Sequence, residues 1–237
     1  MTVHHQAHQD RADVELSFDW DSLPPFVEHV SQVPSGANYV RLSRVANSHR
    51  GLCNLSGVKK LWAHGVNQDF LHEISALKEL EVLHMEKVSA SDLTAVNALP
   101  LLRSLSVIDA PKVTDLSWVP TQPTLRSLAI VNATAVQDLA PLSQLTHLRA
   151  LGVEGGMWTP MQVFSLSPLS TLRQLQSLFI TNLRAKDQSL RALLALSKLR
   201  VLQCAKFFPR EEFDALKQAH PELHCDWFST KHWNAAT

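Results

Sequence analysis

The stretch "VQDLAPLSQLTHLRALGV", residues 136–153, decides the fold of this chain. Four leucines in it are three residues apart, and a valine follows the last of them by two residues: Leu142, Leu145, Leu148, Leu151 and Val153. A spacing of three is close to the helical period, whereas a spacing of two is the strand period. The stretch therefore predicts a helical turn that leads into a short strand.

The same pattern, L-x-x-L-x-x-L-x-(apolar), recurs along the chain. Clear copies begin at Leu77, Leu99, Leu145, Leu172 and Leu196, and weaker copies begin at Leu55, at Gln122 and near His220. The leucines of the expected strands are then Leu61, Leu83, Leu105, Leu128, Leu151, Leu178, Leu202 and Leu223, at steps of 21 to 27 residues. Registered repeats of this length indicate a solenoid, in which each unit buries its leucines against its neighbours.

The repeats resemble the leucine-rich repeat family from Leu52 to about Trp227. "VTDLSWVP" at Val113 and "VQDLAPLSQLTHL" at Val136 are similar to the bacterial, internalin-type repeat, in which an apolar-x-Asp-Leu turn leads back across the convex side. The family's usual asparagine, five residues after the strand leucine, is replaced here by Val88, Ala110, Ala133, Gly156, Leu183 and Phe207. We therefore expect no asparagine ladder, and we expect the turn carbonyls to bond to backbone or water.

The resemblance and the register together predict an α/β leucine-rich repeat solenoid. Its curved parallel sheet should have eight or nine short strands, with helical or 3-10 turns on the convex side. One inward column should consist of Met85, Val107, Ile130, Val153, Ile180, Cys204 and Cys225. The longest helical turns are expected after Leu61, Leu151, Leu178 and Leu202, and Asp187 is expected to be the N-cap of the third.

We expect one domain with caps: a flexible N-terminus and cap over residues 1–51, repeats with a C-terminal capping unit over 52–227, and a tail over 228–237. "DWDSLPPFVEHVSQV" predicts a capping helix that begins near Ser22, with Phe26, Val30 and Val33 on one face. "ANYVRLSRV" predicts an edge strand. "PREEFDALKQAHPELHCDWF" predicts a last helix and strand, with Phe213 and Leu216 turned inward.

The composition limits the classes of partner and the compartment. Lys plus Arg equals Asp plus Glu at 22 each, so there is no global electrostatic reason to bind DNA or a membrane. The chain shows no signal peptide and no apolar run long enough for a membrane span, which predicts a cytoplasmic protein. Cys53, Cys204 and Cys225 are an odd set without C-x-x-C spacing, and we expect Cys204 and Cys225 to be two buried thiols rather than a disulfide.

No catalytic motif is evident. Neither a phosphate loop nor a G-x-S-x-G elbow occurs, and too few residues follow Trp227 for the ubiquitin-ligase domain of some bacterial leucine-rich repeat proteins. We therefore expect no enzyme and no cofactor. The alternative is a metal-binding or enzymatic protein that uses its histidines. Two sets have plausible spacing for ligands: His4, His5 and His8, and His220 with His224 beside Cys225. We expect no metal at either, because the first set lies in the tail and strand residues 224 and 225 face opposite sides.

The register also predicts the concave surface. The outward column at mid-strand consists of Trp62, His84, Ser106, Ala129, Gly152, Phe179, Gln203 and His224. Ile108 and Val131 follow it toward the turns, which predicts a shallow apolar floor between the two aromatic residues. Arg103, Arg126 and Arg149 precede their strands and predict a basic rim.

These columns predict a non-catalytic module that binds a protein partner with an acidic surface through Trp62, His84, Arg103, Ile108, Arg126, Val131, Arg149 and Phe179. The partner of such a small bacterial repeat protein could be one toxin that it neutralises, as an immunity protein does. A general cytosolic scaffold with several partners is the alternative. Nucleic acid is less expected, because two separated aromatic residues make a poor stacking surface. The loop from Gly155 to Pro160, with Met157 and Trp158, is a reserve site on the convex side.

Overall fold

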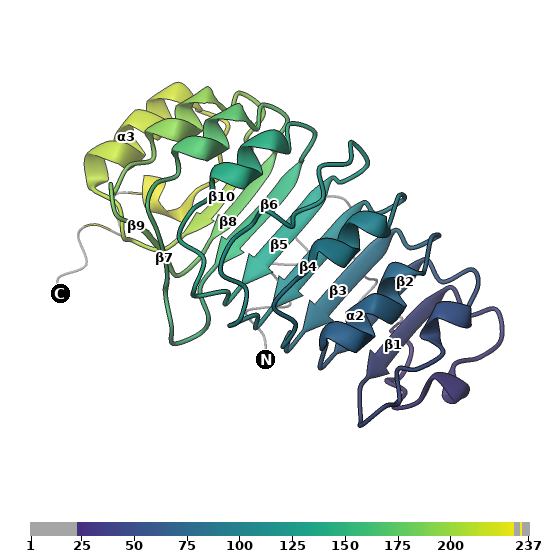
Figure 1. Ribbon diagram of the computed structural model, residues 1–237. Coiled ribbons are helices and arrows are strands. Elements are labelled where there is room, and N and C mark those ends of the chain that lie inside the picture. The colour runs from purple at the N-terminus through teal and green to yellow at the C-terminus, as the bar shows by residue number, and fades with distance from the viewer. Residues whose placement is uncertain (1–22, 230–232, 234–237) are drawn as a thin grey trace.

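The computed structural model describes residues 23–229 and 233, and in this part of the chain the strands stack into one curved parallel sheet (Figure 1). The sheet has eight strands in the order β1-β2-β3-β4-β5-β6-β8-β10. Their bounds are β1 Tyr39–Ser43, β2 Lys60–His64, β3 Val82–Glu86, β4 Ser104–Ile108, β5 Ser127–Val131, β6 Ala150–Glu154, β8 Ser177–Ile180 and β10 Val201–Cys204. The predicted solenoid is therefore confirmed.

The register of the strands is the one that the repeat alignment predicts. Leu61 pairs with Leu83, Leu83 with Leu105, and so on through Leu128, Leu151, Leu178 and Leu202. The second inward column is in the same register from Met85 to Val153, and its members are buried as far as Ile180. Because each leucine covers the one beside it, stacking gives a single continuous core that no unit could form alone.

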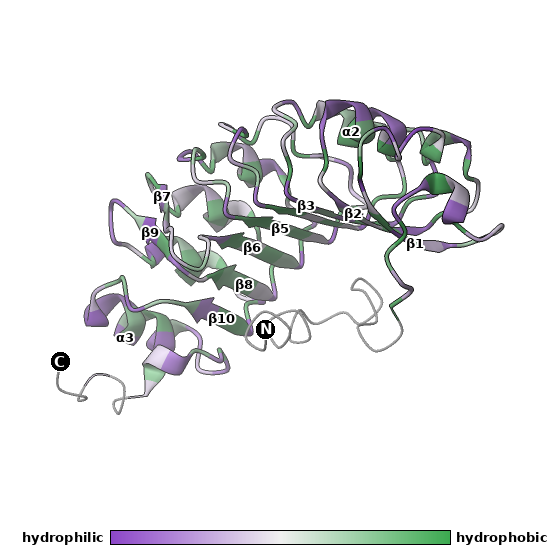
Figure 2. Cartoon of the chain, turned by 90° about the horizontal axis from the view of Figure 1, so that it is seen from below, coloured by the Kyte–Doolittle hydropathy of each residue, from purple (hydrophilic) through white to green (hydrophobic). Residues whose placement is uncertain are grey.

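Helical segments pack against the other face of the core, as the view along the sheet shows (Figure 2). Between residues 23 and 229, two of them are α-helices, α2 Gln68–Ser75 and α3 Arg210–Ala219. The others are 3-10 segments: η3 Val30–Gln32, η4 Leu52–Asn54, η5 Thr94–Ala98, η6 Ala140–Gln144, η7 Ser167–Thr171, η8 Arg191–Ala195 and η9 Asp226–Phe228. Each five-residue 3-10 segment buries one apolar side chain in the core: Val96, Leu142, Leu169 and Leu193.

The prediction of long helices is correct after Leu61 and Leu202 but wrong after Leu151 and Leu178. There the extra residues form β7 Met161–Val163 and β9 Leu183–Ala185, which pair in parallel as a second, two-stranded sheet. The inward residues of both strands are buried, so the added chain widens the core instead of lengthening a helix. Asp187 is not a helix N-cap: its carboxylate accepts the Ser189 N–H at 3.4 Å, and η8 begins later.

The N-terminal cap differs from the predicted helix. Ser22 lies outside the described residues, and the chain at Val27 is extended and bridges Leu42 of β1. Val27 N–H donates to Arg41 O at 2.8 Å, and Ser43 N–H donates to Val27 O at 2.9 Å. These bonds satisfy the edge of β1, so the backbone of Val27 is not available to a helix. Phe26, expected on one face with Val30 and Val33, is exposed, whereas Val30 and Val33 pack against the core.

At the other end, α3 covers the last repeat with Phe213 and Leu216 buried, as predicted. The expected last strand is reduced to a single bridge between Val201 and His224. It ends there because Cys225 is followed at once by the 3-10 segment η9.

The last carbonyls of several strands accept backbone N–H groups, as expected without an asparagine ladder, although the turn carbonyl of Gly156 accepts a hydrogen bond from the Asn182 side chain. Glu86 O accepts Gly65 N–H, Val131 O accepts Asp109 N–H, and Glu154 O accepts Asn132 N–H, all at about 2.9 to 3.0 Å. The backbone ladder of the sheet therefore continues into the turns. Polar residues with left-handed backbone stand one position before the expected asparagines: Lys87, Asp109, Asn132 and Asn182.

Candidate functional site

The concave face is organised around one column of side chains in the register predicted from the sequence. Strand pairing aligns Arg41, Trp62, His84, Ser106, Ala129, Gly152, Phe179 and Gln203. Aromatic rings therefore stand at both ends of a row of small residues. We call the face from Trp62 to Phe179 the concave trough.

Trp62 is not an open anchor, because residues of its own chain surround it. Its ring lies 5.6 Å from the Phe26 ring and 4.6 Å from the His84 ring, measured between centroids. The Arg41 guanidinium lies 4.5 Å from the Trp62 centroid and 3.9 Å from the Phe26 centroid. These contacts leave Trp62 9% exposed. The sequence could not show this, because Phe26 comes from the cap.

A polar pair adjoins this aromatic cluster. His84 Nε2 lies 3.0 Å from the Glu86 carboxylate. Burial by itself works to raise the pKa of Glu86, but the hydrogen bond and the charge of His84 outweigh it, so the pKa of Glu86 lies below its usual value. His84, which the sequence predicts to contact a partner, is buried within the protein.

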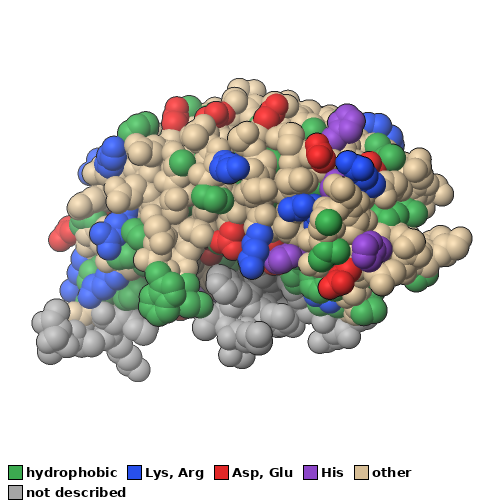
Figure 3. Space-filling model, turned by 60° about the horizontal axis from the view of Figure 1, so that its bottom comes forward, with side chains coloured by type: hydrophobic (Ala, Val, Ile, Leu, Met, Phe, Trp, Pro, Cys, Tyr) green, Lys and Arg blue, Asp and Glu red, His purple; other side chains and the backbone are tan. Residues whose placement is uncertain are grey.

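The arginine rim lies at the opposite edge of the sheet from the apolar floor. Arg103 and Arg126 precede β4 and β5, whereas Ile108 and Val131 end these strands, about 16 Å away along an extended chain. Arg126 donates to the carbonyls of Pro123 and Leu125, and the Arg103 guanidinium lies 3.9 Å from the Glu81 carboxylate. On the side of the molecule that Figure 3 shows, the bottom of the view in Figure 1, basic and acidic side chains are interspersed.

Ile108 and Val131 open into a hollow that the sequence did not predict. The hollow has a volume of about 340 Å³. It is lined by Ile108, Asp109, Val131, Asn132, Gly156, Met157, Trp158 and Thr159. We call it the loop hollow. Met157 is 71% exposed and Trp158 is 87% exposed. The loop at 155–160 was expected on the convex side, but it adjoins the floor at the carboxyl ends of β4 and β5, so the two candidate surfaces are one.

Two glycines allow the loop to lie there. A Cβ on Gly155 would meet backbone atoms of Asn182, Thr159 and Met161, and a Cβ on Gly156 would lie 2.7 Å from Asn132 Oδ1. Asn132 Nδ2 donates to Asp109 Oδ1 at 2.7 Å, and Asn182 Nδ2 donates to Gly156 O at 2.7 Å. The base of the loop is therefore fixed by close packing and by hydrogen bonds, while its tip carries the exposed apolar pair.

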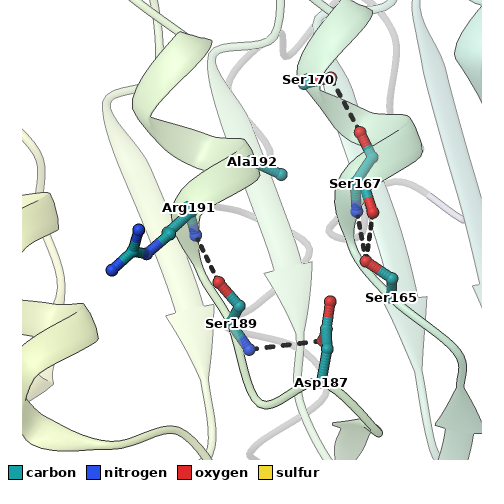
Figure 4. Close-up of a pocket in the computed structure, with 7 residues that line it drawn as sticks. All are labelled: Ser165, Ser167, Ser170, Asp187, Ser189, Arg191 and Ala192. Carbon is teal, nitrogen blue, oxygen red and sulfur yellow. Dashed lines mark hydrogen bonds between the residues drawn. The ribbon is translucent and has the colours of Figure 1, made fainter.

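A second hollow, of about 280 Å³, lies between η7 and η8 and is lined mainly by serines (Figure 4). Its polar groups are used by the turns themselves. Ser167 N–H donates to Ser165 Oγ at 2.9 Å, and Arg191 N–H donates to Ser189 Oγ at 3.2 Å. These bonds begin the 3-10 segments, so they explain the serines without a ligand.

Histidine and cysteine do not assemble a metal site in the described part of the chain, where no three His, Cys, Asp or Glu side chains are grouped to hold an ion. His4, His5 and His8 lie outside the described residues. His220 Nε2 lies 3.0 Å from Leu193 O. Cys204 and Cys225 are free thiols, as expected, but they are half-buried rather than fully buried. The neighbouring Cys225 and burial raise the pKa of Cys204. No described helix has the length and hydrophobicity to cross a membrane.

Comparisons with known proteins give structural neighbours only. No family model matches the sequence, and no curated protein matches it. The structure is similar to an internalin (InlF) of Listeria monocytogenes, with a TM-score of 0.60 at 21% identity over 80% of this chain and 54% of that one. Internalin C2 (InlC2) of the same organism gives a TM-score of 0.48 at 23% identity over 67% of this chain and 71% of that one. The chain thus spans about half the length of the first internalin. It has a leucine-rich repeat fold similar to that of an internalin.

Proposed function

We propose that this chain is a non-catalytic protein-interaction module that binds a protein partner on its concave side, with the loop hollow as the central contact. The observation that carries the proposal is the exposure of Trp158 and Met157 beside the apolar floor of Ile108 and Val131. Large aromatic side chains dominate interface energetics when a partner buries them. An exposed tryptophan on a loop with a fixed base supplies such an anchor at little conformational cost.

The predicted contacts divide by whether they line the loop hollow. Ile108 and Val131 line it, although Val131 is itself only 8% exposed, whereas the buried residues Trp62, His84 and Phe179 do not. We therefore assign the anchor role to Met157 and Trp158, which the partner can reach directly. Arg103, Arg126 and Arg149 favour a partner with acidic groups at the far edge, where they mainly speed association and make it sensitive to salt.

The test compares capture of partner by three immobilised proteins: the parent, Trp158→Ala and Leu101→Ala. Leu101 is the matched control, because it is an apolar side chain that is 47% exposed outside the loop hollow. Loss of an anchor that contributes about 2 kcal/mol lowers affinity about thirtyfold, so a specific partner should be retained by the parent and by Leu101→Ala but not by Trp158→Ala. Equal capture by all three proteins would refute the proposal.

In its narrower form, the proposal makes the partner one dedicated protein in a bacterial cytoplasm, such as a toxin that this chain inhibits. A single partner should elute with the chain as a 1:1 complex in size-exclusion chromatography with light scattering. Several partners in substoichiometric amounts would instead indicate a general scaffold.

A further inference from the structure

The burial of Phe179 requires an explanation. Leu178 and Ile180, on either side of it in β8, belong to the core, but Phe179 faces the concave trough and is not part of the core. Its neighbours in register are Gly152, which has no side chain, and Gln203. A ring in this position on an uncovered sheet would be exposed to solvent, yet Phe179 is 0% exposed. Its burial therefore indicates that the concave trough is covered.

The shape of the trough fits large side chains. Ser106, Ala129 and Gly152 occupy the middle of the column, between Trp62 and Phe179. Ala129 is also buried, although it too is outside the core. Small residues between two aromatic ends leave room above the sheet that apolar side chains can fill.

The first described residues lead into this trough. Leu23 packs against Trp62 and Val82, in a cluster separate from the core. Arg41 Nη1 donates to Pro24 O at 3.0 Å and so fixes the chain beside Trp62. Leu23, the first described residue, therefore lies at the Trp62 end of the trough.

The sequence before Leu23 has the chemistry that the trough requires. In "DVELSFDWD", residues 13–21, the apolar residues Val14, Leu16, Phe18 and Trp20 alternate with polar ones, four of which are acidic. Such alternation places all four apolar side chains on one side of an extended strand. Residues 1–22 hold five acidic residues and one basic residue, and because the whole chain is balanced, the rest has the matching positive excess.

The lengths also agree. Nine extended residues span about 30 Å. The trough crosses five strand spacings from β2 to β8, which is about 24 Å. The stretch can therefore reach from Trp62 to Phe179.

We propose that residues 13–21 bind the concave trough of their own chain in extended form, with their apolar side chains over Ser106, Ala129 and Gly152 and their acidic side chains on the opposite, solvent-facing side. The segment occupies the face beside the loop hollow and competes with any partner that extends across it. A partner segment with the same alternation of apolar and acidic residues fits the trough best. The proposal concerns the same side as the proposed function, but its tests need this chain alone, so each can fail without the other.

Photocrosslinking tests the position of the segment in the full chain. Phe18 is replaced by p-benzoylphenylalanine, and crosslinked peptides are mapped by mass spectrometry after irradiation. We expect crosslinks within one molecule, at any protein concentration, to peptides that contain Ala129 or Gly152. The control places the same group at Phe164, an exposed residue in the turn after β7, and should give no crosslink to these peptides. Crosslinks confined to the convex turns, or formed only between two copies, would overturn the proposal.

A second measurement detects the uncovered trough. Leu16→Asp combined with Phe18→Asp should raise the fluorescence of the apolar dye 1-anilinonaphthalene-8-sulfonate several-fold, with an unchanged circular dichroism spectrum. A synthetic peptide of residues 12–22 should then displace the dye. His4→Asp combined with His5→Asp adds the same charge outside the segment and should leave the fluorescence unchanged. Equal fluorescence for the two double variants, or failure of the peptide to displace the dye, would contradict the proposal.

Discussion

At the scale of single residues, a pair of adjacent glycines decides where the exposed anchor stands. Gly155 and Gly156 follow β6 directly, and both are approached too closely to carry a Cβ without movement. The atoms near Gly155 are backbone, whereas those near Gly156 belong to the Asn132 side chain. The same addition of a methyl group should therefore have different consequences at the two positions.

Gly155→Ala should lower the free energy of unfolding by about 1 to 3 kcal/mol, because backbone cannot yield as a side chain can. Gly156→Ala should cost less stability, since Asn132 can turn, but it breaks the bond to Asp109 and weakens partner binding. Denaturant titration of both variants measures the difference. A larger loss at Gly156 than at Gly155 would contradict this account of the loop.

A buried histidine predicts a pH effect. His49 is 1% exposed and packs against the Phe70 ring at 5.2 Å, and neither ring nitrogen has a hydrogen-bond partner within the described chain. Burial first, and then the charge of Arg44, lowers the pKa of His49. The unfolded chain therefore binds a proton at His49 more readily than the folded chain, so this residue reduces stability as the pH falls below about 6.5.

His49→Phe should remove that contribution. Between about pH 7.5 and about pH 5.5, on either side of the ordinary histidine pKa, the free energy of unfolding should fall less in the variant than in the parent. Urea unfolding at a series of pH values measures both slopes, and the comparison cancels the effect of the other histidines. Parallel slopes would show that His49 does not titrate differently in the two states.

At the scale of elements, the return from strand to convex turn is built by one repeated hydrogen bond. A side-chain oxygen accepts the N–H two residues later in five successive units, at Asp92, Asp115, Asp138, Ser165 and Asp187. This bond turns the chain by satisfying a backbone donor that the following segment leaves unpaired. The apolar-x-Asp-Leu motif of the sequence is thus explained by a bond that it forms.

Asp115→Ala should remove this bond and lower the free energy of unfolding by about 0.5 to 1 kcal/mol, as loss of a helix cap does. Asp115→Ser should keep most of the stability, because Ser165 accepts the Ser167 N–H in the same way. The hydrogen bonds from Ser117 also lower the pKa of Asp115, so the stabilisation is present at neutral pH and is lost as the pH falls through that lowered pKa. Thermal unfolding ranks the variants, and equal losses for alanine and serine would refute the role of the bond.

The elements that could be predicted from the sequence are those whose apolar period is local. Every strand from β2 to β10 in the main sheet was predicted by its own alternation, which Leu61 and Ala63 or Leu105 and Val107 illustrate. The sheet of β7 and β9 carried the same signal in Met161 and Val163, but a spacing of 27 residues suggested a helix instead. The prediction of a helix in the N-terminal cap was wrong, because β1, which is distant in sequence, forms the backbone hydrogen bonds of Val27.

At the scale of the whole molecule, the stacking of repeats aligns equivalent residues of successive strands into the columns of the concave face. The columns of the concave face could be predicted, because the register passes from strand to strand without a shift. The burial of Trp62 and the position of Trp158 could not, since both depend on where a cap and an insertion return to the sheet. The exposed residues of the proposed binding surface therefore lie where regular stacking is interrupted.

The measurement that tests this account most directly is a hydrogen-exchange footprint of the chain in complex with the partner that it captures. We expect slower exchange, relative to the free chain, in peptides that cover residues 155–159 and the carboxyl ends of β4 and β5, with little change in η7 and η8 on the convex side. Protection confined to the convex segments, with the loop at 155–159 unchanged, would contradict the assignment of the concave side as the binding surface.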